Sequence, residues 1–176
     1  MNSDLIIRVI SYIFACGLIL PVQAENNVMA DKVAVQAAFL FNFGLFTEWP
    51  SLPDNEFKIC VIADDKILNA LAALKNRRIK EHSISINKID SSKLAVQCQI
   101  LFVGISAQTS MKEIAGQIAL APVLVIAEEG SYDPGDVIIA LNEQQNRIGF
   151  KINRTEAAKR SLTFSSKLLK LATQVY

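Results

Sequence analysis

Apolar residues in this chain fall into short runs separated by stretches with helical periodicity. The runs are typical of buried β-strands, and the amphipathic stretches are typical of helices that cover a sheet. The predicted strands are residues 57–63, 84–89, 100–103, 123–127, 137–141 and 147–152. The predicted helices are residues 28–48, a helix that Asp64 or Asp65 caps and that continues to about residue 74, then 110–120, 155–161 and 164–175, with a helical turn at 94–98.

The order of these elements predicts the fold class. Strands alternate with helices up to residue 127, which is the pattern of crossover units in a parallel sheet. The last two strands are separated only by residues 142–146 and read as a hairpin. We therefore expect an α/β domain, a three-layer sandwich with a mostly parallel sheet flanked by helices and an antiparallel carboxy-terminal edge.

The helix 28–48 is unusually rich in aromatic residues. Phe39, Phe41, Phe43 and Phe46 spread around almost its whole circumference, and Trp49 stands where it ends. A helix that is apolar on all sides is either deeply buried or packed against a partner. Trp49 is therefore a candidate partner contact.

The stretch "LTFSSKLLKLATQVY" at residues 162–176 is also apolar and contains no acidic residue. We expect its helix to pack on the sheet or across a dimer interface. Ser165 or Ser166 is expected to cap it.

The first 24 residues read as a secretory signal peptide. Residues 5–20 are nearly all apolar, and Val22-Gln23-Ala24 forms a small-residue cleavage site. The alternative is an uncleaved anchor, although the longest apolar run is shorter than the ~20 residues of a bilayer span. The prediction is a signal peptide at 1–24, one domain at 25–176 and a periplasmic location.

Composition narrows the classes of function. The chain has 176 residues, of which 51% are hydrophobic and 20% charged, with a net charge of +1. These values are typical of a globular domain, and the absence of a basic stripe argues against a nucleic-acid partner.

The sequence offers little catalytic chemistry. It contains no glycine-rich phosphate loop and no nucleophile elbow, and His82 is its only histidine. We predict no enzyme activity, no cofactor and no metal site. In open α/β sheets ligands bind beyond the carboxyl ends of parallel strands, which here would collect Asp64, Asp65, Gly104, Ser106, Glu128 and Glu129. Glu128 is the candidate ligand contact; the alternative is that these acids are helix caps and loop charges.

Removal of the leader would leave Cys60 and Cys98. In an oxidising compartment two cysteines are candidates for one disulfide. The alternative is a pair of buried free thiols.

Four stretches, taken in order, resemble the YfiR family of bacterial periplasmic proteins. They are "AAFLFNFGLFTEWP", "FKICVIADD", "CQILFVG" and "RIGFKINRTEAAKRSLTFSSKLLKLA". The last stretch is the most specific, because it joins a strand of the form Arg-Ile-x-Phe-x-Ile-Asn to an Ala-Ala turn and Ser-Ser-Lys-Leu-Leu.

The resemblance implies a non-enzymatic regulator. Such proteins bind the periplasmic sensor region of a membrane-bound diguanylate cyclase and repress it, which lowers cyclic-di-GMP and biofilm output. It also implies a homodimer and a disulfide between Cys60 and Cys98. The alternative function is a small-ligand-binding module that feeds another membrane sensor, such as a histidine kinase.

Three basic residues flank the strand 147–152 and complete the candidate contacts. Arg147, Lys151 and Arg154 contact an anion or a partner in the functional interpretation. In the alternative interpretation they belong to a solvated face at the edge of the sheet.

Overall fold

The computed structural model describes residues 23–52, 55–90, 92–130, 132–144 and 147–176, with side chains from Lys32 onward except at 92 and 108–110. Residues 1–22 of the predicted signal peptide and residues 145–146 of the predicted hairpin turn lie outside the described part. The chain divides into two compact units, Met1–Ala30 and Asp31–Tyr176. The second unit holds the sheet and the candidate site.

The main sheet has eight strands in the described residues, in the order β10-β8-β7-β6-β5-β2-β4-β3. Five of its seven neighbouring pairs are parallel, whereas β7 with β8 and β3 with β4 are antiparallel. The strands are β2 Glu56–Ile62, β3 Arg78–Ile79, β4 His82–Lys88, β5 Ile100–Val103, β6 Leu124–Glu128, β7 Ile139–Gln144, β8 Arg147–Ile152 and β10 Gln174–Val175. The mostly parallel α/β fold and the antiparallel hairpin of β7 and β8 are therefore as predicted.

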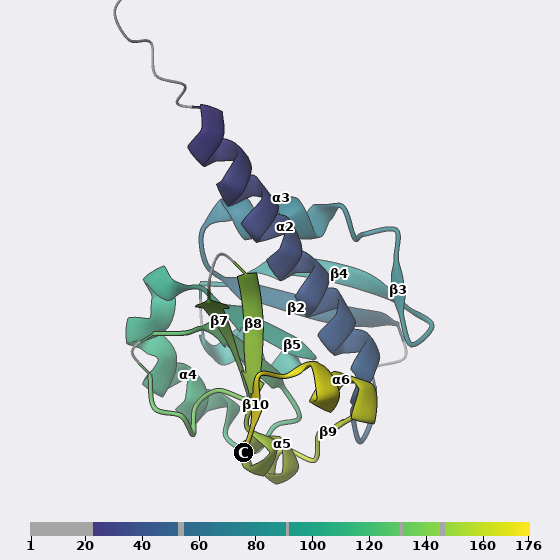
Figure 1. Cartoon of the computed structure of the whole chain (residues 1–176). Helices are drawn as coiled ribbons and strands as arrows, with labels where there is room; N and C mark the ends of the chain where they lie inside the picture. The colour runs from purple at the N-terminus through teal and green to yellow at the C-terminus, as the bar shows by residue number, and fades with distance from the viewer. Residues whose placement is uncertain (1–22, 53–54, 91, 131, 145–146) are drawn as a thin grey trace, which may run out of the picture. The chain divides into compact units, whose positions relative to one another are not determined.

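Helices cover both faces of this sheet (Figure 1). Alternate residues of the central strands point to opposite faces, so Ile100 and Phe102 of β5 join one core while Leu101 and Val103 join the other. The helical elements are α2 Gln23–Phe46, α3 Asp65–Ala72, η1 Ser92–Gln97, η2 Ile105–Ser110, α4 Met111–Ile118, α5 Arg154–Lys159 and α6 Ser166–Leu171. These two separate cores make the three layers of the predicted sandwich.

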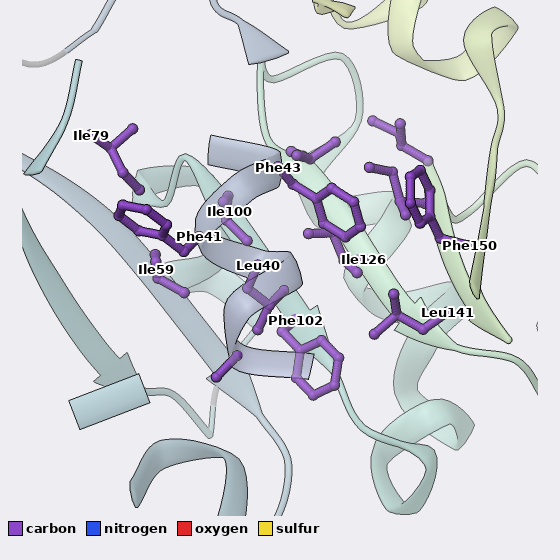
Figure 2. Packing of buried hydrophobic residues seen from close by; sticks show 14 of the residues in the cluster. Leu40, Phe41, Phe43, Ile59, Ile79, Ile100, Phe102, Ile126, Leu141 and Phe150 are labelled. Carbon is purple, nitrogen blue, oxygen red and sulfur yellow. The ribbon is translucent and has the colours of Figure 1, made fainter. Parts of the chain in front are cut away.

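The first core lies between the sheet and α2, α3, α5 and α6. Phe43 of α2 is fully buried and meets the Phe150 ring of β8 edge-on, with the ring centroids 4.9 Å apart. Figure 2 shows Leu40, Phe41 and Phe43 of α2 pointing toward the strands. The outer side of α2 remains open, since Val35 is 44% exposed. The helix is thus buried on one side only, and the predicted choice between burial and a partner contact stays open for its outer side.

The second core is aliphatic and lies under α4 and η1. Met111, Ile114 and Ile118 of α4 pack on the other side of β5 and β6. Cys60 and Cys98 belong to this core and are joined by a disulfide, with Cα atoms 5.9 Å apart.

The predicted helix 164–175 is wrong in its second half. Helix α6 ends at Leu171, and Ala172 is extended, with φ −67° and ψ 139°. The chain then pairs with β8 as the parallel strand β10. Thr173 donates from both N and Oγ1 to the Phe150 oxygen, at 2.8 and 2.9 Å. Edge groups of β8 need hydrogen-bond partners, and β-branched Thr173 and Val175 suit a strand, so sheet pairing outweighs the helical pattern.

The packing of this last segment leaves both parts of the expectation in place. Leu168 is buried in the core, whereas Leu171 and Val175 are exposed in the single chain, so packing across a dimer stays a prediction for them. Ser165 caps α6, its Oγ accepting a hydrogen bond from Leu168 N at 3.3 Å, which settles the choice between the two serines.

A small second sheet fixes the end of α2. Strand β1, Thr47–Glu48, follows α2 directly and pairs antiparallel with β9, Thr163–Phe164. Ser165 N donates to the Phe46 oxygen at 2.9 Å beside it. The predicted helix 28–48 therefore ends two residues early, because these residues pair with a distant strand.

Candidate functional site

The acidic side chains at the carboxyl ends of the strands have partners within the protein. Asp64 caps α3 by accepting a hydrogen bond from Lys66 N at 3.1 Å. Asp65 pairs with Lys88, and Glu129 pairs with Lys151 at 2.6 Å. The interpretation of these acids as caps and surface charges describes most of this rim.

Glu128, at the end of β6, is held by two separate elements. Its Oε1 accepts a hydrogen bond from Gln36 Nε2 of α2 at 2.8 Å, and its Oε2 accepts one from Ile105 N at 2.9 Å. Gln36 is only 5% exposed. Glu128 therefore joins α2 to the ends of β5 and β6, and the buried amide of Gln36 depends on it.

A cleft of about 300 Å³ opens beside this carboxylate. Its apolar wall is formed by Ile105, Leu141 and Ile148. Its lining also includes an ion pair, in which Lys32 Nζ lies 2.6 Å from Glu143 Oε2. The remaining lining residues are Gln36, Glu128, Glu129 and Asn142. This arrangement can hold a small molecule that carries an ammonium group and an apolar part.

Close packing shapes the neighbouring turn after β5. A Cβ placed on Gly104 would lie 2.6 Å from the Ala63 Cβ, closer than real Cβ atoms approach. Glycine at this position lets the ends of β2 and β5 lie together, and Gly104 N donates to the Ile62 oxygen at 2.9 Å. Gly104 is thus a packing requirement of the turn that leads into the cleft.

Trp49 lies far from the cleft. Its ring meets Phe57 edge-on at 5.1 Å, at the beginning of β2. Glu128 ends β6, and β2 and β6 run in the same direction on either side of β5. The two residues therefore stand at opposite ends of the sheet. Trp49 Nε1 is buried without a hydrogen-bond partner among the described residues.

The three predicted basic contacts are also separated. Arg147 begins β8 and is exposed, Lys151 lies near the end of β8 in its ion pair with Glu129, and Arg154 starts α5. The structure thus distributes Trp49, Glu128, Arg147, Lys151 and Arg154 over several surfaces. Their roles as contacts remain predictions.

One charged cluster was not foreseen from the sequence. Arg160, after α5, is only 4% exposed, and its Nη1 has no hydrogen-bond partner among the described residues. Burial lowers the pKa of Arg160, while the nearby carboxylates of Glu156 and Asp136 oppose that shift. Burial also raises the pKa of Asp136, and the charge of Asp133 adds to the rise. A basic residue in a polar stretch gives no sequence signal that it will be buried.

The pKa of Tyr132 is raised, like that of Asp136. Burial, together with the charges of Glu129 and Tyr176, raises the pKa of Tyr132 to about 12. Its phenol therefore stays protonated well above its ordinary range and packs as part of the second core.

The sequence profile of the YfiR/HmsC-like family matches residues 33–173. The chain belongs to this family. The match spans both cores and every strand of the main sheet except β10, and it includes Cys60, Cys98 and the rim with Glu128. It agrees with the resemblance drawn from the four sequence stretches.

Membership indicates the class of function. The YfiR/HmsC-like family suggests a periplasmic regulator of diguanylate cyclase signalling, and a regulator rather than an enzyme. The disulfide fits an oxidising compartment. Among the described residues, no helix of this YfiR/HmsC-like chain has the length and apolar character of a membrane span, and no group of acidic, histidine or cysteine side chains is placed to hold a metal ion.

Solved structures with low identity share the fold. A conserved domain protein from Vibrio cholerae is 13% identical, with a TM-score of 0.56. An ABC domain from Streptococcus pneumonia, solved in complex with L-Trp, is 10% identical, with a TM-score of 0.54. Each match covers 82% of this chain and 60% of the other chain, so this chain spans less than two thirds of those proteins. At such identities the similarity concerns the α/β fold alone.

Proposed function

We propose that this YfiR/HmsC-like protein is a periplasmic regulator that binds the periplasmic sensor region of a membrane-bound diguanylate cyclase and represses it, lowering cyclic-di-GMP and biofilm output. The family match over residues 33–173 carries the proposal. The disulfide between Cys60 and Cys98 supports a location outside the cytoplasm. We propose further that residues 1–24 are a cleaved signal peptide and that the protein acts as a homodimer.

The test is the cellular level of cyclic-di-GMP in a strain that lacks the protein. We expect the level to rise on deletion and to fall again when the full chain is restored. A copy that lacks residues 1–24 is the matched control, because it stays in the cytoplasm and should not restore repression. An unchanged level on deletion contradicts the role as cyclase repressor.

A second function is favoured by the cleft beside Glu128, namely binding of a small ligand that is passed on to another membrane sensor. The cleft lies where open α/β sheets bind ligands, and it combines carboxylates with an apolar wall. The similar fold solved in complex with L-Trp makes amino acids the natural first probes.

A thermal-shift screen of amino acids tests this second function. A ligand that binds only the folded state raises the melting temperature in proportion to the logarithm of its concentration. Glu128→Gln should abolish the shift, while Glu81→Gln, at an exposed position outside the cleft, should leave it unchanged. A shift that is the same in both variants excludes this cleft as the site.

A further inference from the structure

The free edge of the sheet at β10 carries a marked excess of positive charge. Residues 147–176 contain seven lysines and arginines and one glutamate, so they hold a net charge of +6, whereas the whole chain holds +1. Arg154, Lys167 and Lys170 are exposed and form no ion pair with a described residue. The charge is therefore available to a partner.

The backbone of β10 has an unpaired side. Tyr176 N donates to the Ile152 oxygen at 3.0 Å, and the Tyr176 oxygen accepts from Arg154 N at 2.7 Å, so Tyr176 directs its backbone groups toward β8. Successive residues of a strand direct these groups to opposite sides. The backbone N–H and C=O of Val175 therefore face away from β8, where no described strand pairs with β10.

Apolar surface and a groove accompany this edge. Leu171 is 68% exposed, Val175 39% and Tyr176 47%. A groove of about 510 Å³ runs from Val175 and Tyr176 along α5, past Arg154 and Lys159. In Figure 1 α5, α6 and β10 gather near the end marked C.

We propose that this surface binds an extended acidic segment of a partner protein, which adds to the sheet beside β10 and places its carboxylates against Arg154, Lys167 and Lys170. Strand addition uses the backbone groups of a free edge for affinity and neighbouring side chains for specificity. The proposal rests on the proposed function in so far as the partner is the sensor region of the cyclase.

Charge decides which occupant fits. A second copy of the chain would bring two strongly positive surfaces together, which opposes pairing. An anionic membrane would meet the lysines but would leave the backbone groups of Val175 unpaired. An acidic strand satisfies both features. Charged residues on edge strands also serve to prevent pairing, and that protective role is the outcome that would overturn the proposal.

The first experiment measures binding of a fluorescein-labelled peptide of alternating Glu and Val residues by anisotropy, with the full chain. We expect Arg154→Glu, Lys167→Glu and Lys170→Glu combined to weaken binding about tenfold or more, since three charge pairs turn repulsive. The matched control is Lys66→Glu, Lys75→Glu and Lys93→Glu, all exposed and outside this surface. Equal weakening in both variants, or no binding by the unchanged protein, overturns the proposal.

The second variant separates strand addition from simple charge attraction. Val175→Pro removes the outward N–H without changing charge, whereas Val175→Thr keeps it. We expect the proline variant alone to lose binding, with circular dichroism confirming that both variants are folded. Retained binding by Val175→Pro excludes strand addition. Binding of phosphatidylglycerol vesicles in place of the peptide assigns the surface to a membrane and overturns the proposal.

Cells distinguish this proposal from the proposed function. If the unchanged protein lowers cyclic-di-GMP and the triple Glu variant does so equally well, the regulatory role stands and the docking surface is wrong. If the unchanged protein has no effect on cyclic-di-GMP, the regulatory role is wrong, and the peptide measurements alone decide on the docking surface.

Discussion

The two faces of the sheet are stabilised in different ways. On the first face, the long helix α2 brings Phe41 and Phe43 against Phe57, Phe102 and Phe150. On the second face, the buried residues under the short helices α4 and η1 are aliphatic or cysteine, and a disulfide joins β2 to the residue after η1. Burial of large aromatic side chains stabilises one face, and a disulfide together with smaller side chains stabilises the other.

The difference follows from the lengths of the helices that pack on each face. A long helix buries enough apolar area to stay in place by packing alone. Helix α4 has eight residues and η1 has six, and such short elements bury less and gain little from helix formation itself. The Cys60–Cys98 disulfide lies on the face that these short helices cover.

Phe43→Ala should produce the largest loss of stability. The fully buried ring contacts Phe39 and Phe150, and its removal should lower the free energy of unfolding by about 3–5 kcal/mol. Urea denaturation checks this value. Val35→Ala, on the exposed side of the same helix, should change the free energy by no more than about 0.5 kcal/mol. Similar losses in the two variants would show that α2 is not held by its aromatic side.

Loss of the disulfide should produce the second-largest loss of stability and should loosen the face that α4 and η1 cover. The bond joins cysteines 38 positions apart, and replacing both by alanine should cost about 3–4 kcal/mol through the regained entropy of the unfolded chain. Hydrogen exchange should rise first in η1 and α4, with α2 still protected. A uniform rise over both faces would contradict the division between them. A reductant should leave the double-alanine variant unchanged.

The sequence predicted the central sheet well and its margins poorly. The run "VLVIA" is wholly apolar and "FKICVIA" is apolar except for Lys58, as suits a buried strand, and the structure places most of each run in β6 and β2. The segment after Leu171 was predicted as helix because its apolar spacing fits one. This segment is instead extended because Thr173 packs against Gly149 of β8. A Cβ on residue 149 would lie 2.9 Å from Thr173 Cγ2, so glycine at this position leaves room for Thr173 beside β8.

Glu128→Ala tests the polar attachment of α2 to the sheet and should have a moderate effect. The substitution leaves the buried Gln36 amide without its partner and should cost about 1–3 kcal/mol in unfolding free energy. Glu143→Ala is the matched control, because its ion pair with Lys32 is largely exposed and surface pairs contribute about 0–1 kcal/mol. Equal effects would mean that Glu128 contributes no more to stability than an exposed ion pair does.

The candidate site was predictable only in part. Glu128 stood out because it follows a buried strand, and position after a strand is a reliable sign of the rim. Gln36 gave no such sign, since it occurs within an apolar helix and its partner is 92 positions away. Arg160 was missed for the same reason. Pairings between distant polar residues have no local pattern from which they can be read.

Asp136→Asn should give the smallest effect, and a stabilising one. The folded state raises the pKa of this carboxyl, mainly through burial. Folding therefore favours the protonated form, and stability falls as the pH rises from the ordinary aspartate pKa of about 3.9 through the raised value. The asparagine variant should melt at a higher temperature near neutral pH, and its advantage should vanish below pH of about 4. Melting curves at both pH values decide; an advantage that does not depend on pH would place its origin outside this titration.

The pairing of β1 with β9 has a consequence for how the chain acquires its structure. Thr47 lies opposite Phe164, 117 positions later, and Ser165 holds the last carbonyl of α2. A growing chain therefore cannot fix the end of α2 until residues up to Ser165 have emerged. Until then the aromatic side of α2 has no complete sheet to cover, and a protein that crosses a membrane before folding would need a holding chaperone for that interval.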